Sequence, residues 1–461
     1  MSHDLDKRQK AKGSRRKAKD FEFGSWNSEG GNRNSCFGFR ILASEILNRL
    51  LKRDFLKPPV LWEEHSFKVV WSGLDVKRGN IMSEISAKRR ARDLGLPFEG
   101  TPGAYNAITD IAGVEVGFTT LIEGDGPVQV GKGPIRTGVT AILPRGKREK
   151  PGPIWAGHFN LNGNGEMTGT HWINEAGYFN SPICITNTHS IGMVHHAVVG
   201  WMIDQYKGFL QDGHGWAMPV VAETYDGLTN DICGRHIHEE HVLAAIKTAA
   251  SGVVAEGNVG GGTGMVTYEF KGGTGTASRL VSIGSADYTV GVLVQSNFGT
   301  RKDLRILGVP VGRHMPENAV YTEIRASETG SIIVIIGTDI PMLPVQLRRV
   351  AKRAAIGIGR TGTPGGNYSG DIFLAFSTAN DFDLPNMHGL QPFKFTLDYF
   401  NDHYFDDIYR ATVQAIEEAV VNAMIAAESM TTVKPAGYTV DAIDHNRLRQ
   451  IMRRYNRLRD N

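Results

Sequence analysis

The sequence predicts a layered α/β or α+β fold for the part of the chain that follows Ala87. Two observations support this prediction: expected strands and helices alternate in groups, and several strands are apolar on both faces. A strand of that kind belongs in a sheet that helices cover. The chain has 461 residues, 41% of them apolar and 21% charged, so it is long enough to bury a sizeable core.

The first half of this region contains four expected strands and two expected helices. Apolar alternation favours strands over 108–122, with a turn at Gly113, and over 137–146, 181–192 and 219–227. Helical spacing of apolar residues favours helices over 193–206 and 239–251.

The second half continues the same alternation. Strands are expected over 288–297, 331–339 and 371–380, and helices over 343–358 and 404–427. The segment 331–339 gives the strongest strand signal, because it is a run of isoleucine and valine. Glycine is in excess, with 55 residues in small clusters, which indicates tight turns and close approaches between backbones.

Composition excludes several classes of protein. A net charge of +3 is too weak to indicate a nucleic-acid partner. Cys36, Cys184 and Cys233 are widely spaced, which favours a reducing, cytoplasmic compartment over a disulfide framework. No apolar run is long enough for a transmembrane helix, and no apolar segment follows the basic N-terminus as in a signal peptide.

Residues 1–81 differ in composition from the rest. They are basic and then rich in glycine, serine and asparagine, which predicts disorder, with one amphipathic segment around 41–55. Met82 begins a stretch that reads as a domain start, so 82–461 is the expected catalytic domain. The segment 1–81 is either an accessory extension or an artefact of an upstream start, and we assign it no chemistry.

Glycine-rich motifs do not predict a nucleotide site. The segment "GIGRTG" at 357–362 follows a helix, whereas a dinucleotide fingerprint follows a strand and opens a helix. It is therefore interpreted as a helix end with a turn. The segment "GNVGGGTGM" at 257–265 lacks the Gly-Lys-Ser/Thr ending of a phosphate loop.

Histidines form two clusters. "HIHEEH" at 236–241 is interpreted as a solvated helix start, with its glutamates in the first turn. A metal site formed by His236, His238 and His241 stays an alternative. The pair at 195–196 lies in an apolar helix, which favours a core or interface position.

Ser331 is the best candidate nucleophile, although the sequence has no G-x-S-x-G elbow. It follows Gly330 at the head of an apolar strand, and glycine permits a strained backbone before the serine. Strain would favour attack of the hydroxyl on the preceding carbonyl, and hydrolysis would then free a new N-terminus. Its α-amine, with a pKa near ~8, could act as general base for the hydroxyl of the same residue. An ordinary strand-leading serine is the alternative.

Several segments along the chain favour the catalytic interpretation of Ser331 over that of an ordinary strand-leading serine. They are "RARDLGLPFEGTPGAYNAITDIAGVEVG" (90–117), "NGNGEMTGTHWINEAG" (162–177), "ITNTHSIG" (185–192), "VVAETYDGLTND" (220–231), 257–265, "VQSNFG" (294–299), "TGSIIVIIGTD" (329–339) and "YSGDIFLAFSTAN" (368–380). On these motifs the chain, from about Ala87 to the last long helix, resembles the L-aminopeptidase D-amidase/D-esterase (DmpA) family, which includes the β-aminopeptidases.

The resemblance implies a fold and a processing event. The fold is an αββα sandwich, similar to N-terminal-nucleophile hydrolases but with a different strand connectivity. The precursor is expected to cleave itself between Gly330 and Ser331. The large subunit 82–330 and the small subunit 331–461 would then stay associated, and homo-oligomers, tetramers of processed heterodimers, are expected.

The resemblance also implies roles for residues near the nucleophile. Ser331 would be the catalytic serine, Ser369 and Asp371 would orient it, and Asn297 with Tyr225 would stabilise the oxyanion. Glu223 would bind the substrate's free amine, Trp216 would form a wall of that pocket, and Asn258 and Gly261 would shape the site. No metal and no organic cofactor is implied, and the substrate would be a small peptide, amide or ester.

Alternatives remain open for these residues. Tyr225 and Trp216 could be plain core aromatics, and Glu223 could be the partner in a salt bridge. The chain could also be a catalytically altered homologue with a binding or non-hydrolytic role, because folds persist when sites are lost. Against this, every proposed position holds a chemically competent residue.

Overall fold

The structure is a computed structural model that describes residues 88–324, 330–384 and 392–459. Contacts divide the chain into Met1–Gly79 and Asn80–Asn461, and only the second unit contains described residues. The predictions made for 1–81, including the amphipathic segment at 41–55, therefore lie outside the described residues.

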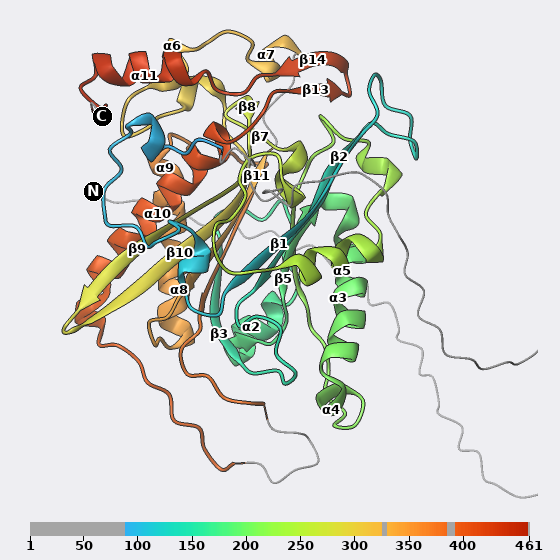
Figure 1. Cartoon of the computed structure of the whole chain (residues 1–461), viewed down its shortest axis with the longest axis vertical. Coiled ribbons are helices and arrows are strands. Elements are labelled where there is room, and N and C mark those ends of the chain that lie inside the picture. Colours follow the sequence, from blue (N-terminus) through green and yellow to red (C-terminus); the bar gives the residue numbers. More distant parts are fainter. Residues whose placement is uncertain (1–87, 325–329, 385–391, 460–461) are drawn as a thin grey trace, which may run out of the picture. The chain divides into compact units, whose positions relative to one another are not determined.

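Two β-sheets form the centre of the described unit (Figure 1). The four-stranded sheet has the order β1-β2-β5-β6, and the six-stranded sheet has the order β4-β3-β12-β11-β10-β9. The strands of the first are β1 (Glu115–Glu123), β2 (Ile135–Leu143), β5 (Ile183–Asn187) and β6 (Val220–Thr224); those of the second are β3 (Ile154–Asn160), β4 (Tyr178–Phe179), β9 (Gly273–Ile283), β10 (Ala286–Asn297), β11 (Ser331–Thr338) and β12 (Gly370–Ser377). Two small hairpins add β7 (Val266–Thr267) with β8 (Phe270–Lys271), and β13 (Met430–Val433) with β14 (Ala436–Val440).

Helices cover the outer face of each sheet. On the four-stranded sheet lie α3 (Ile191–Gln205) and α5 (Glu239–Thr248); on the six-stranded sheet lie α8 (Pro344–Lys352), α9 (Ala354–Arg360) and α10 (Phe405–Ile425). The inner faces of the sheets pack on each other through residues such as Ile185, Ala222 and Ile333. These layers confirm the expected αββα sandwich. The shorter helices are α2 (Thr170–Ala176), α4 (Lys207–Leu210), α6 (Val311–His314), α7 (Val320–Glu323) and α11 (His445–Arg454).

Strand β11 occupies the middle of the six-stranded sheet. It runs parallel to β12 and antiparallel to β10, and all its residues are buried. Ile332 and Val334 face the helices, whereas Ile333 and Ile335 face the other sheet. The same alternation directs the Ser331 side chain between the two sheets.

Some sequence boundaries are corrected by the structure. The expected strand 108–122 begins only at Glu115, because the Asp110 carboxylate accepts the backbone N–H groups of Tyr105 and Ala107 and stabilises a 3₁₀ turn. The expected helix 343–358 is two helices that meet at Arg353. As predicted, "GIGRTG" forms the end of α9 and a turn, with Gly362 at φ +111°.

Helix α10 is the helix expected over 404–427. It packs on β9, β10 and α9 of the same chain, and it is buried without interruption from Ala411 to Ile425. Its apolar surface is therefore covered without a second subunit. Among the described residues, no helix has the length and apolar character needed to cross a membrane.

Candidate active site

Ser331 lies between two strand ends. Its backbone neighbours are Asn297 at the end of β10 and Gly370 at the start of β12. The side chain is buried, and its Oγ accepts a hydrogen bond from the Gly370 N–H at 3.2 Å. A Cβ at position 370 would lie 2.4 Å from the Asn164 carbonyl oxygen, so a glycine is needed to bring that loop against the nucleophile.

The Asn297 amide is held in one orientation by two backbone groups. Its Oδ1 accepts the Val266 N–H at 2.8 Å, and its Nδ2 donates to the Tyr225 carbonyl at 2.9 Å. An amide nitrogen carries two N–H groups, so one is left to donate to another acceptor. Because the side chain is buried, this donor is preorganised, as oxyanion stabilisation requires.

A cavity of about 210 Å³ adjoins this side of the nucleophile. It contains three of the residues named from the sequence, Tyr225, Asn297 and Gly330. The Tyr225 ring bends over Gly227, where a Cβ would lie 2.3 Å from the phenol oxygen. Tyr225 is 43% exposed, so it is not a plain core aromatic.

Ser369 and Asp371 contact each other through their side chains. The Ser369 hydroxyl donates to Asp371 Oδ1 at 2.5 Å, and Asn162 Nδ2 donates to Asp371 Oδ2 at 3.1 Å. Alternation along β12 gives Asp371 the same face as Phe373, which packs toward the helices. The pair therefore lies beside the main chain of Ser331, whereas the Ser331 hydroxyl points between the sheets.

Glu223 is a buried carboxylate on the other side of the nucleophile. It accepts the Glu166 N–H at 3.0 Å and the Thr188 hydroxyl, and no described cation pairs with it. Burial raises its pKa, and the hydrogen bond from Thr188 opposes this shift. A Cβ at Gly165 would lie 3.1 Å from Glu223 Oε1 and 3.4 Å from the Gly370 Cα, so the carboxylate adjoins the β12 neighbour of Ser331.

Trp216 is also not a core aromatic, because it is 46% exposed. Its ring packs edge-to-face on Trp172, with centroids 6.2 Å apart and an interplanar angle of 88°. An exposed indole that rests on another is suited to form a wall for a ligand.

Two residues predicted to shape the substrate site do not line the cavity. The Asn258 side chain bridges the backbone N–H and carbonyl of Glu428, just beyond α10. Gly261 packs under β5, where a Cβ would lie 2.6 Å from the Ile185 carbonyl oxygen. From the same motif, Gly264 does line the cavity.

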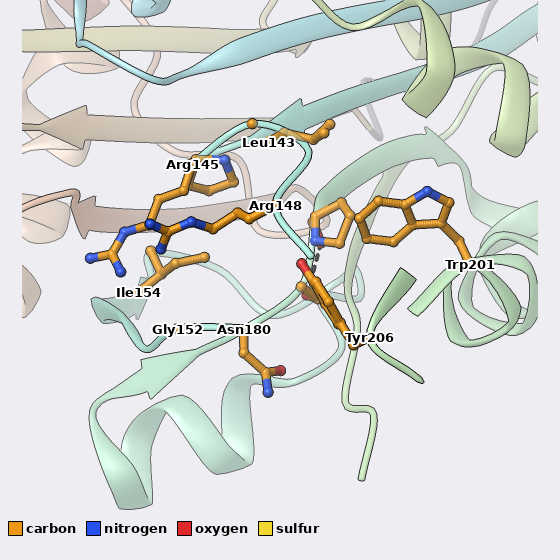
Figure 2. A pocket seen from close by; sticks show the side chains of 12 residues that line it. Leu143, Arg145, Arg148, Gly152, Ile154, Asn180, Trp201 and Tyr206 are labelled. Atoms are coloured by element: carbon orange, nitrogen blue, oxygen red, sulfur yellow. Dashed lines mark hydrogen bonds between the residues drawn. The ribbon is translucent and has the colours of Figure 1, made fainter. Parts of the chain in front are cut away.

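A second cavity lies at the opposite end of the sheets (Figure 2). Leu143 and Ile154 line it, and they belong to the end of β2 and the start of β3. Its volume is about 20 Å³, enough for about one water molecule and too small for a peptide. It is therefore not a candidate substrate site.

The histidine cluster forms the expected helix start. His238 immediately precedes α5, its backbone N–H donates to His241 Nδ1, and Glu239 and Glu240 occupy the first turn. His236 pairs instead with Asp231 at 2.9 Å. Over the ranges that the structure describes, no group of three or more His, Cys, Asp or Glu side chains is arranged to hold a metal ion.

Two buried ionisable groups near the site were missed from the sequence. Asp226 is fully buried after Tyr225, and burial raises its pKa to about 7. Lys271 is fully buried in β8 and donates to the Met265 and Gly272 carbonyls, and burial lowers its pKa to about 7. Asp226 at least falls within the motif at 220–231, whereas no local pattern marks Lys271.

A buried serine at the head of a central strand in an αββα sandwich is the arrangement expected of a serine hydrolase of the N-terminal-nucleophile type. The model of peptidase family S58 matches residues 106–437. The chain belongs to that family, as the sequence motifs indicated.

Characterised relatives and solved structures support the same assignment. The beta-peptidyl aminopeptidase BapA of Sphingosinicella microcystinivorans is 52% identical over 381 residues, which are 80% of this chain and 93% of that protein. The L-aminopeptidase D-Ala-esterase/amidase of Ochrobactrum anthropi is 56% identical with a TM-score of 0.76, covering 80% of this chain and 99% of that one. That structure is described as a prototype for the serine aminopeptidases and a new variant of the Ntn hydrolase fold. A Burkholderia sp. beta-aminopeptidase is 43% identical with a TM-score of 0.71, covering 79% and 99%.

Proposed function

We propose that the protein cleaves its own chain between Gly330 and Ser331, and that the freed Ser331 releases N-terminal residues from peptides, amides or esters. The observation that supports this most directly is the placement of Ser331, buried between Asn297 and Gly370 beside the cavity that Gly330 lines. The aminopeptidase activity of the relatives named above supports the same reaction.

Self-cleavage would proceed by an acyl shift. The Ser331 hydroxyl attacks the Gly330 carbonyl carbon, a C–O bond forms, the C–N bond breaks, and the hydroxyl proton passes to the departing nitrogen. Water then hydrolyses the ester, which leaves a carboxylate at Gly330 and an amine at Ser331. The hydrogen-bonded Ser369–Asp371 pair lies beside this backbone and would orient the new amine.

Substrate hydrolysis would use the same hydroxyl in a second acyl transfer. The substrate's ammonium group pairs with Glu223, and this pairing favours the ionised carboxylate against the burial that raises its pKa. The Ser331 amine accepts the hydroxyl proton, and Asn297 with Tyr225 stabilises the oxyanion. Water then releases the first residue from the acyl-enzyme.

We also propose a cytoplasmic tetramer of processed heterodimers. The oligomer rests on the family resemblance alone, since α10 is covered within the chain. The compartment rests on cysteine usage: among the described residues Cys184 and Cys233 are free thiols.

The Ser331→Ala variant tests the proposal. We expect wild-type protein to give two bands on a denaturing gel, with the smaller one beginning at Ser331, and the variant to give one uncut and inactive chain. The exposed Ser282 provides a matched control, because Ser282→Ala should be processed and active. Wild-type protein that stays one intact chain and still releases amino acids would contradict the mechanism.

A further inference from the structure

Among the described residues, one charged side chain lines the cavity beside Ser331. The residues are Tyr225, Gly227, Leu228, Gly264, Val266, Asn297, Tyr321, Ile324, Gly330 and Lys434. Lys434 is the cation, and no acid is among the described residues that line the cavity. Lys434 is exposed, and no described carboxylate pairs with it.

Glu223 and Lys434, two of the charged groups near the nucleophile, lie on opposite sides of it. Glu223 adjoins Gly370, the neighbour of Ser331 on β12. The cavity with Lys434 adjoins Asn297, the neighbour of Ser331 on β10. A substrate whose ammonium group is at Glu223 and whose carbonyl is at Ser331 therefore extends its leaving group toward Lys434.

We propose that this cavity is the leaving-group subsite and that Lys434 binds the α-carboxylate of a short peptide, so that the enzyme selects zwitterionic dipeptides. This inference rests on the proposed aminopeptidase function, and it adds the chemistry of the group that leaves. The acid and the cation are complementary to the two ends of such a substrate.

The size of the cavity fits a single residue. Its volume of about 210 Å³ is below the roughly 300–1,000 Å³ of sites for drug-sized ligands. Leu228, Val266 and Ile324 give it apolar walls that suit a side chain. A longer peptide would carry its C-terminal carboxylate further from its first carbonyl than a dipeptide does.

Backbone hydrogen bonds hold the segment that carries Lys434. The Val433 N–H donates to the Leu228 carbonyl at 2.9 Å, and the Val128 N–H donates to the Val433 carbonyl at 3.3 Å. The hairpin of β13 and β14 lies at one end of the unit near α7, with which it shares a small apolar cluster that includes Val266 and Val320 (Figure 1). These bonds hold the backbone at Lys434 beside the cavity, while the lysine side chain is exposed to solvent.

Self-cleavage would place another carboxylate in this cavity, at Gly330. If Lys434 bound that new C-terminus instead of a substrate, substituting Lys434 would change the kinetics of every substrate. If Lys434 binds the leaving group, only substrates that carry a carboxylate there would respond. The two cases are separated by substrates that differ only in the leaving group.

The test compares Lys434→Gln and Lys434→Glu with wild-type protein on three substrates that share the first residue. They are a dipeptide, its C-terminal amide and a p-nitroanilide. Exposed ion pairs contribute up to about 1 kcal/mol, or about fivefold. We expect Lys434→Gln to raise KM for the dipeptide about three- to fivefold, and Lys434→Glu to raise it about tenfold or more. The dipeptide amide and the p-nitroanilide should change less than twofold.

Two further measurements make the test decisive. The wild-type preference for dipeptide over dipeptide amide should shrink in high salt, because exposed charges are screened. Lys247→Glu makes the same charge change on the outer helix α5 and should leave all three substrates unaffected. Equal effects of Lys434→Glu on all three substrates, or no effect on the dipeptide, would overturn the proposal. Wild-type protein that hydrolyses none of them would refute the proposed function itself.

Discussion

Two aspartates at opposite ends of the paired sheets show opposite electrostatics. Asp226 follows β6 at the end that contains Ser331; it is fully buried, and burial raises the pKa of its carboxyl to about 7. Asp381 follows β12 at the other end, near the cavity of Figure 2. Hydrogen bonding to Arg148 lowers the pKa of its carboxyl, and Arg145 also pairs with it.

The difference separates a region built for chemistry from a region built for stability. Around Ser331, Glu223 is held by a hydroxyl and a backbone N–H, and Lys271 by carbonyls, without described ions of opposite charge. Such groups cost folding free energy but are poised to bind a charged ligand or to exchange a proton. At the far end, Asp381 is paired with arginines and partly exposed, so its contribution to stability is favourable but small.

The largest effect, a loss of activity at the end that contains Ser331, is expected from Glu223→Gln. Glutamine preserves the acceptor for Glu166 and Thr188 but removes the charge that pairs with the substrate's ammonium. Losing one partner of a buried charge pair costs about 2–5 kcal/mol. We therefore expect kcat/KM for amine-bearing substrates to fall by about 10²-fold or more while cleavage at Ser331 continues, measured by steady-state kinetics and gel analysis.

Glu166→Gln is the matched control for that variant. Glu166 is exposed; its backbone N–H donates to Glu223, and its carboxylate makes only a lesser contribution to the raised pKa of Glu223. The change should therefore alter kcat/KM less than about threefold. If Glu223→Gln retained wild-type kcat/KM, the amine would bind elsewhere and the buried carboxylate would be structural.

An intermediate effect, on stability, is expected from Asp226→Asn. The folded pKa of Asp226 lies above its unfolded value near 3.8, so the native state holds a proton that the unfolded state releases between about pH 4 and 7. This group therefore makes the wild-type protein less stable as pH rises through that window. The amide cannot ionise, so the variant should gain on the order of a few kcal/mol relative to wild type between pH 5 and 8. Urea unfolding of both proteins at the two pH values measures the gain, and a constant difference would contradict it.

The sequence predicted the central elements because their signals are local. The isoleucine and valine run of β11 marks a buried strand, and the motifs around Ser331, Asn297 and Glu223 placed those residues by resemblance. Strand β9 was missed because its sequence, "GTGTASRLVSI", is rich in small residues that read as turns. A Cβ at Gly275 would lie 2.0 Å from the Ala419 carbonyl oxygen, so these small residues are needed where α10 packs on the strand.

Other features depend on partners that are distant in the chain. No local sequence pattern predicts that Asp226 is buried beneath β2 or that Lys434 lies in the same cavity as Tyr225. Each position depends on how separate segments of the chain pack together. Asn258 and Gly261 illustrate the reverse case. Their motif was recognised, but only the fold shows that one residue anchors the end of α10 and the other packs under β5.

The smallest effect is expected at the far end, from Asp381→Asn. Its folded pKa is lowered by hydrogen bonding to Arg148, so its contribution is present above the unfolded value near 3.8 and is lost as pH falls through the folded pKa. Because the side chain is 43% exposed, we expect a loss of only about 0.2–1 kcal/mol at pH 7, with activity unchanged. This difference should shrink toward zero in acid, whereas the gain from Asp226→Asn grows toward neutral pH. Asp383→Asn, which changes a more exposed acid 3.4 Å from Lys150, is the control and should be neutral. Parallel pH profiles for the Asp226 and Asp381 variants would remove the distinction between the two ends of the sheets.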